Sequence, residues 1–147
     1  MTVEALPHRR NASLRPADMI GSLLHKANQK HDAKWAAGQV TPRQARVLMA
    51  VAEDEGCSQT DLVDRTGVDR STLADIVRRL NKRKMVKRRR TEKDARMYSV
   101  TLTDEGRKLT QEMAKKSHAI GEEFLSPLSA NAQSALINAL QVVVDAP

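Results

Sequence analysis

A dense group of cations lies between residues 78 and 96. Residues 86–102 read VKRRRTEKDARMYSVTL, where four consecutive cations are followed by a polar break and then by alternating apolar and polar residues. Only Glu92 and Asp94 oppose the positive charge between residues 78 and 96. Lysines and arginines at this density neutralise phosphates and release counterions from a nucleic acid. The stretch therefore predicts contact with a DNA backbone, because a solvated charge run would not need the alternation that follows it.

Short polar side chains and cations share one face of the helix expected over residues 69–83. The opposite face is apolar, with Leu73, Ile76, Val77 and Leu80 at helical spacing. A helix that reads the major groove needs small hydrogen-bonding groups near its start and cations further along. For this helix alone, an amphipathic helix with a solvated outer face is an equal alternative. The candidate DNA-contacting residues of the helix are Ser71, Thr72, Asp75, Arg78, Arg79 and Lys82.

The charged side chains of this helix suit particular base edges. Arg78 or Arg79 could chelate O6 and N7 of a guanine, which is the commonest specific contact to DNA. Asp75 could accept a hydrogen bond from a cytosine amine, or it could orient one of the arginines. The sequence leaves these two roles of Asp75 open.

The basic segment after the helix supplies a second set of candidate contacts. Arg96 stands at its tip, where a single arginine can enter the minor groove and meet a focused negative potential. Asp94, two residues earlier, could hold that arginine in one orientation, form the turn, or do both. The candidate DNA-contacting residues of this segment are Lys87, Arg88, Arg90, Lys93, Asp94 and Arg96.

The elements that position these residues can be read from the chain. Ser58 is expected to cap a short helix, Thr66-Gly67-Val68 to form a tight turn, and Asp69 to cap the helix over 69–83. A short helix, a glycine-containing turn and a second helix predict a helix-turn-helix. The alternation over 97–102 and the strand expected over 86–90 predict a two-stranded hairpin with its loop at 91–95. A hairpin directly after a helix-turn-helix predicts a winged helix.

Helices are expected on both sides of this region. Residues 1–14 are expected to form a flexible arm, and a helix is expected from Pro16 to about Ala37, ended by Gly38. The next helix is capped by a box of Thr41 and Gln44 and ends before Gly56, and a later one runs from Thr103 to about residue 125. A last helix covers 129–144. The expected buried positions of the second and last of these helices are Ala45, Leu48, Met49, Ala52, Leu136, Ala139, Leu140, Val143 and Val144.

Length and composition fit one domain that is mainly α with a small β-hairpin wing. The chain has 147 residues, and only 2% are aromatic, which leaves a core of aliphatic side chains that suits helices. The formal charge of +7 favours a polyanionic partner. The one cysteine allows no intrachain disulfide, and the four histidines show no metal-ligand spacing. We expect no enzyme activity, no cofactor, no metal, no membrane span and a cytoplasmic location.

From Thr41 to Leu109 the chain resembles the MarR family, the multiple-antibiotic-resistance-type regulators. The resemblance rests on QTDLVDRTGVDRSTLADIVRRL, on the Asp94-Ala95-Arg96 triplet and on VTLTDEG at 100–106. It implies a homodimer whose terminal helices, 15–38 and 104–147, interlock beside a DNA-binding winged helix-turn-helix over 39–103. Two departures from the family stand out: Thr91 replaces a common acidic residue, and Met85 stands where many relatives have glycine.

The resulting functional prediction is a sequence-specific transcriptional regulator that reads a pseudo-palindromic operator in double-stranded DNA. The resemblance implies a repressor released by a small, anionic molecule bound between the dimer helices and the DNA-binding region. Candidate ligand contacts are His31, Trp35 and Arg46, although His31 could equally be an interface histidine and Arg46 a solvated cation. The alternatives are an architectural DNA-binding protein with little sequence preference, a redox-responsive regulator that uses Cys57, and a protein-interaction module.

Overall fold

A computed structural model describes residues 15–35 and 38–147, so the arm expected over 1–14 lies outside the described residues. The chain divides into two compact units, the first ending at Lys34 and the second running from Trp35 to Pro147. The described part of the first unit is the helix α1, Pro16–Ala33. Among residues 15–35 and 38–147, no helix is long and apolar enough to cross a membrane.

Helix α1 ends earlier than the sequence predicts. Its C-cap is Lys34, so the expected end at Gly38 is wrong. The physical reason is Trp35, which is only 4% exposed and belongs to the core of the second unit. No residue of α1 is buried, and its apolar side chains at Met19, Ile20, Leu23 and Leu24 are 39–51% exposed.

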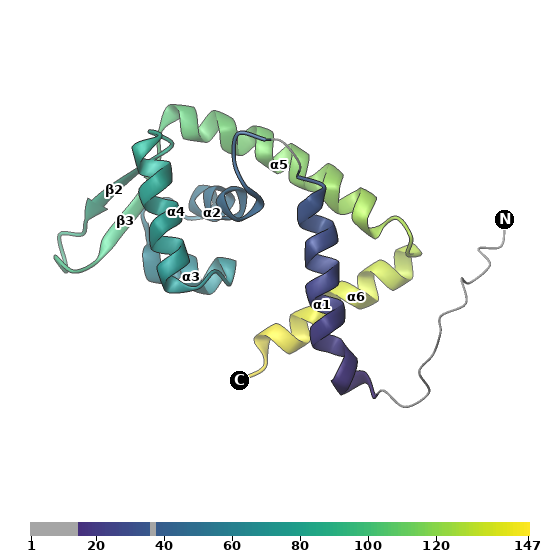
Figure 1. The fold of residues 1–147 in the computed structure, drawn as a ribbon. Helices are drawn as coiled ribbons and strands as arrows, with labels where there is room; N and C mark the ends of the chain where they lie inside the picture. Colours follow the sequence, from purple (N-terminus) through teal and green to yellow (C-terminus); the bar gives the residue numbers. More distant parts are fainter. Residues whose placement is uncertain (1–14, 36–37) are drawn as a thin grey trace. The chain divides into compact units, whose positions relative to one another are not determined.

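The second unit is a winged helix-turn-helix with two further helices after it (Figure 1). Its three-stranded sheet is antiparallel with the order β1-β3-β2. The hairpin of β2 and β3 confirms the predicted wing, whereas the sequence missed β1, because two residues carry no alternation that could be read. The elements are α2 Pro42–Glu53, β1 Cys57–Ser58, α3 Gln59–Thr66, α4 Arg70–Lys82, β2 Val86–Arg90, β3 Tyr98–Leu102, α5 Asp104–Leu125 and α6 Ala130–Asp145.

Side-chain caps set the helix starts at the predicted residues. Ser58 Oγ accepts from the backbone N–H of Asp61 at 3.1 Å, and the Asp61 carboxylate accepts from the backbone N–H of Ser58 at 3.0 Å. The same reciprocal box joins Thr41 and Gln44 at the start of α2. These bonds satisfy backbone donors that a helix start leaves unpaired. Gly67 then ends α3 at a φ of 67°, which is the left-handed conformation expected of a glycine in this turn.

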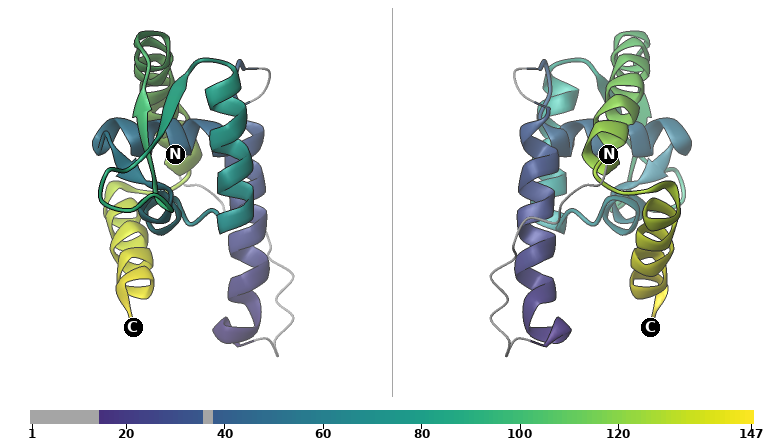
Figure 2. Two further views of the ribbon diagram at one scale, coloured as in Figure 1. Left: turned by 90° about the vertical axis from the view of Figure 1, so that its left-hand side faces the viewer. Right: turned by 90° about the vertical axis from the view of Figure 1, so that its right-hand side faces the viewer.

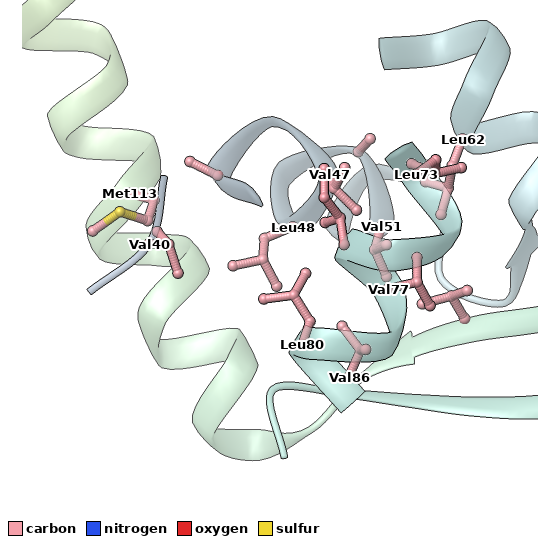
Figure 3. Close-up of a cluster of buried hydrophobic side chains, with 14 of the residues drawn as sticks. Val40, Val47, Leu48, Val51, Leu62, Leu73, Val77, Leu80, Val86 and Met113 are labelled. Carbon is pink, nitrogen blue, oxygen red and sulfur yellow. The ribbon is translucent and has the colours of Figure 1, made fainter. Parts of the chain in front are cut away.

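The core of the second unit joins α2, α3, α4, the wing and α5 (Figure 3). All four predicted inner residues of α4 are buried, from Leu73 to Leu80. Helix α2 is buried on a wider face than predicted, because α3, α4 and β3 contact it as well as α5. Val47 and Val51 are therefore completely buried, whereas Ala52, expected to be inside, is exposed.

Helix α6 does not bury the residues that the sequence predicts. None of its side chains is buried, and Leu136, Val143 and Val144 are 38%, 72% and 76% exposed. Among the described elements of the second unit, none packs closely along this helix. The sequence pattern of an apolar face on α6 is therefore present, but the described residues of the second unit do not bury it.

The end of α4 and the start of α5 meet at a tight junction. Thr103 Oγ1 donates to the carbonyl oxygen of Lys84 at 2.6 Å, and the Thr103 backbone N–H donates to the carbonyl oxygen of Met85 at 3.1 Å. A Cβ on Gly106 would overlap the Met85 carbonyl oxygen, so the close approach requires glycine. The left-handed residue here is Lys84, at a φ of 60°, one position before Met85.

Candidate nucleic-acid interface

The first turn of α4 holds two of the predicted DNA contacts through its cap. Asp69 Oδ1 accepts from the backbone N–H of Thr72 at 2.9 Å and from Ser71 Oγ at 2.8 Å. These hydrogen bonds lower the pKa of Asp69 from 3.8 to about 2, and those from Thr72 contribute most. Ser71 is exposed and Thr72 half-buried, so the cap fixes the geometry of two small polar groups at the start of the helix.

Further along α4, one carboxylate gathers two arginines. The Asp75 carboxylate accepts from Nε of Arg79 at 2.7 Å and from a terminal nitrogen of Arg78. The hydrogen bond from Arg78 is the main cause that lowers the pKa of Asp75, and Arg79 adds to it. The structure therefore gives Asp75 the arginine-orienting role that the sequence left open. Lys82 lies beyond them in the last turn and is exposed.

The strand register places the wing cations on two faces. Arg88 pairs with Val100 and Arg90 with Tyr98, so both lie on the face that carries Val86 into the core. Lys87 and Arg89 alternate with them and lie on the opposite face. The wing thus presents exposed cations on both sides along its length. The two strands that carry them, β2 and β3, are drawn as arrows in Figure 2.

Tyr98 organises the cations on the first of these faces, and the sequence analysis did not select it as a site residue. The guanidinium carbon of Arg88 lies 3.6 Å from the centroid of the Tyr98 ring. Arg90 Nε donates to the Tyr98 hydroxyl at 3.3 Å, and this bond is the main cause that lowers the pKa of Tyr98. A cation–π contact combined with a hydrogen bond restricts two flexible side chains at once. The only sequence signal was a tyrosine opposite alternate arginines in the hairpin.

The tip of the wing is held by backbone bonds rather than by an ion pair. Asp94 Oδ1 accepts from the backbone N–H of Arg96 at 2.9 Å, so Asp94 forms the turn and does not hold the guanidinium. Thr91 Oγ1 donates to the carbonyl oxygen of Asp94 at 2.8 Å, which gives the non-acidic Thr91 a structural role. Lys93 is exposed within this turn.

A cleft of about 250 Å³ lies between the starts of α3 and α4 and the wing. Arg88 and Arg96, both predicted from the sequence, line it together with Arg70, which the sequence analysis missed. Gln59 also lines the cleft, and its buried Oε1 has no hydrogen-bond partner among the described residues. A small cleft lined by three arginines is a site suited to an anion.

The predicted ligand contacts fall in both compact units, and each unit is described by itself. His31 lies on α1 in the first unit, where its Nδ1 is 3.2 Å from Oδ1 of Asp32. Trp35 and the half-buried Arg46 belong to the second unit. Lys116 of α5, which the sequence analysis did not select, donates to the Trp35 carbonyl oxygen at 3.3 Å and lies 5.6 Å from the centroid of its ring. The buried Nε1 of Trp35 has no partner within the described ranges.

Cys57 does not have the environment of a redox sensor. It is buried in β1, and this burial, with the nearby carboxylates of Asp54 and Asp61, raises the pKa of its thiol. The idea that a helix dipole lowers this pKa is therefore wrong, because desolvation outweighs it. A reactive cysteine needs thiolate character and access to solvent.

Comparisons with known proteins agree with this geometry. A model of the MarR family matches residues 39–97. The transcriptional repressor NicR of Pseudomonas putida is 31% identical over 132 residues, which are 87% of this chain and 84% of NicR. This chain belongs to the MarR family. It is a DNA-binding transcriptional regulator, in a family of regulators rather than enzymes.

Two solved structures of MarR-family regulators share the fold. BpsR of Bordetella bronchiseptica, whose DNA binding is regulated by 6-hydroxynicotinic acid, has 30% identity and a TM-score of 0.80, covering 86% of this chain and 99% of its own. PcaV of Streptomyces coelicolor in complex with its natural ligand has 30% identity and a TM-score of 0.81, covering 91% of this chain and 97% of its own. The predicted fold class, a mainly helical winged helix-turn-helix, is confirmed.

Proposed function

We propose that this MarR-family regulator is a homodimeric, cytoplasmic repressor that reads a pseudo-palindromic operator. Helix α4 enters the major groove, while the wing follows the backbone and Arg96 enters the adjacent minor groove. The observation that supports this arrangement is the cleft where α4 and the wing meet, because it gathers Arg70, Arg88 and Arg96 on one side of the unit. In this proposal residues 39–103 bind DNA, and residues 15–38 and 104–147 form the dimer.

Bases and phosphates are read by different side chains in this proposal. Arg78 and Arg79 contact base edges from α4, and Ser71 and Thr72 lie near the groove floor at its start. Phosphates are neutralised by the other cations, whose exposed positions support the assignment: Arg70, Lys82, Lys87, Arg88, Arg90 and Lys93. Contacts to base edges give sequence specificity, and contacts to phosphates give an affinity that falls as the salt concentration rises.

Selection from a random duplex library with the full chain tests this proposal. Two recognition helices of a dimer face the same side of the duplex when half-sites lie one helical turn, about 10 base pairs, or a multiple of it apart. We expect enrichment of a two-fold symmetric motif with this spacing. Arg96→Ala should bind the selected duplex several-fold more weakly, and Lys87→Ala should weaken all duplexes equally and flatten the salt dependence by about one unit of slope. Enrichment of no motif would refute the operator-reading function.

Dimer formation is supported by apolar side chains that are exposed among the described residues. On α6, Ile137, Val142, Val143 and Val144 are 51–76% exposed, and α1 exposes its own apolar stripe. Monomeric proteins rarely expose large contiguous apolar patches, and those that do generally use them to bind a partner. Light scattering coupled to size exclusion should give the mass of two chains. Val143→Asp should shift the protein toward monomer and weaken operator binding, whereas a wild-type monomer would contradict the proposal.

A small carboxylate is the proposed effector. BpsR responds to 6-hydroxynicotinic acid, and in this chain Lys116 supplies a cation beside Trp35, whose indole N–H has no partner within the described ranges. Titration of 6-hydroxynicotinate into the wild-type complex with its selected duplex should release the protein. Lys116→Met keeps the aliphatic stem and should bind DNA normally but lose this response. No release at millimolar 6-hydroxynicotinate would reject this compound class as effector while leaving the DNA-binding proposal standing.

An architectural role is the second candidate function. One observation favours it: the wing has exposed cations on both of its faces. Such a wing can bind the phosphate backbone of DNA of any sequence. Equal affinity of the wild-type chain for selected and scrambled duplexes would support it.

A further inference from the structure

Asp75 occupies an unusual place for an acidic residue, on the outer side of a helix that meets a polyanion. Its side chain is 38% exposed, and those of Arg78 and Arg79 are 71% and 65% exposed. One carboxylate therefore serves two guanidinium groups on the surface of α4 that we assign to the major groove. Exposed ion pairs of this kind contribute little to folding stability, so stability does not explain why the acid is there.

The atoms used in these contacts determine what the arginines can still bind. Arg79 uses Nε for the Asp75 carboxylate, at 2.7 Å. Within the described part of the chain its two terminal nitrogens make no hydrogen bond to another side chain, so they remain for another acceptor. A guanidinium presents its donors as a rigid planar fork, and a fork held at one edge presents the other edge in a fixed direction. That edge matches the O6 and N7 acceptors of a guanine.

The charge of Asp75 opposes binding to the phosphate backbone of DNA. The three side chains together carry a single net positive charge, whereas the two arginines without Asp75 would carry two. Hydrogen bonds from both arginines lower the pKa of Asp75, so the carboxylate stays ionised at neutral pH. An ionised acid close to phosphates weakens binding to every duplex, irrespective of sequence.

We propose that Asp75 is a specificity-determining residue: it orients Arg79 toward a guanine edge and, by its charge, weakens binding of α4 to non-cognate DNA. The residue acts through its neighbour and needs no contact with a base. This inference rests on the proposed function, because it requires that α4 read an operator.

Paired binding measurements test the role of Asp75. The probes are the duplex selected by the wild-type chain and a scrambled duplex of the same composition, each titrated with Asp75→Asn, Asp75→Glu and wild-type protein. Asp75→Asn should bind the scrambled duplex about threefold to tenfold more tightly and steepen the salt slope by about one. It should lower the preference for the selected duplex by about tenfold, the scale of one bidentate base contact. Asp75→Glu should restore part of this preference.

Glu112→Gln is the matched control. Glu112 is exposed on α5, and the substitution removes one negative charge from the same unit without touching α4. It should leave the preference unchanged. The inference fails if Asp75→Asn and Glu112→Gln prefer the selected duplex over the scrambled one to the same extent. It also fails if Asp75→Asn binds both duplexes equally more weakly and the melting temperature of the protein falls. A wild-type chain without any preferred duplex would instead refute the proposed function itself, so the two failures are distinguishable.

Discussion

Gly106→Ala should destabilise the protein, although alanine normally favours a helix. A Cβ at residue 106 would overlap the carbonyl oxygen of Met85 and lie 2.8 Å from its carbonyl carbon. Backbone atoms cannot rotate away as a flexible side chain can, so the start of α5 has to move. Gly121 lies in the same helix and serves as the matched control, because a Cβ added there would meet no neighbouring segment within 4 Å.

The size of the effect follows from the contacts at this junction. Movement of α5 would weaken the bonds from Thr103 to the carbonyl oxygens of Lys84 and Met85, which are 2.6 Å and 3.1 Å long. Each such bond contributes about 0.5–1.5 kcal/mol, and overpacking costs about 1–3 kcal/mol. Against these losses, alanine gains about 1 kcal/mol in helix propensity. The net expectation is a loss of about 1–5 kcal/mol for Gly106→Ala.

Urea unfolding followed by circular dichroism measures this difference, at one fixed protein concentration because a dimer's stability depends on it. Gly121→Ala should be unchanged or more stable by up to about 1 kcal/mol. Equal stability of the two alanine variants would refute the close approach of α5 to Met85. It would also remove our physical explanation for the glycine that ends the VTLTDEG motif.

Three further predictions concern single side chains. Lys84→Gly should stabilise the protein in urea unfolding by about 1 kcal/mol, because Lys84 has a φ of 60° and glycine adopts that conformation without strain; a loss of stability would contradict it. Because the folded pKa of Asp69 is about 2 and its ordinary value 3.8, its stabilising effect is present above about pH 3.8 and is lost as pH falls through about 2. Asp69→Asn keeps a capping oxygen and should therefore lose less stability than wild type in this pH range, as acid titration at constant urea would show. Tyr98→Ala should weaken binding to all duplexes more than Tyr98→Phe, because only phenylalanine keeps a ring under Arg88; equal affinities in fluorescence anisotropy would exclude that role.

Local sequence signals were sufficient for most of the winged helix. Capping residues such as Ser58 and Asp69 act on backbone groups within three residues, so their effect can be predicted without knowing the fold. The apolar face of α4 was predicted for a similar reason, since one helix period determines it. Arg88 and Arg96 were selected on charge and position alone, and the structure places both at one cleft.

The errors arose where distant segments decide the outcome. Trp35 does not continue the apolar stripe of α1, because it packs in the core of the second unit. Val47 is buried because α2 is covered on more than one side. The part played by Tyr98 depends on strand register, which brings it opposite Arg90. In α6 the apolar pattern was correct, but none of its side chains is buried among the described residues, because burial depends on a partner surface that the pattern does not specify.

Operator reading by α4 is best tested by the affinity of the wild-type chain for the DNA upstream of its own gene, beside a scrambled duplex, at physiological salt. Fluorescence anisotropy with both duplexes gives the two dissociation constants under one condition, which removes the salt dependence from the comparison. A sequence-specific regulator should prefer the upstream duplex by about a thousandfold or more. Equal affinity for that duplex, and for any duplex enriched by selection, would contradict operator reading by α4 and favour the architectural role.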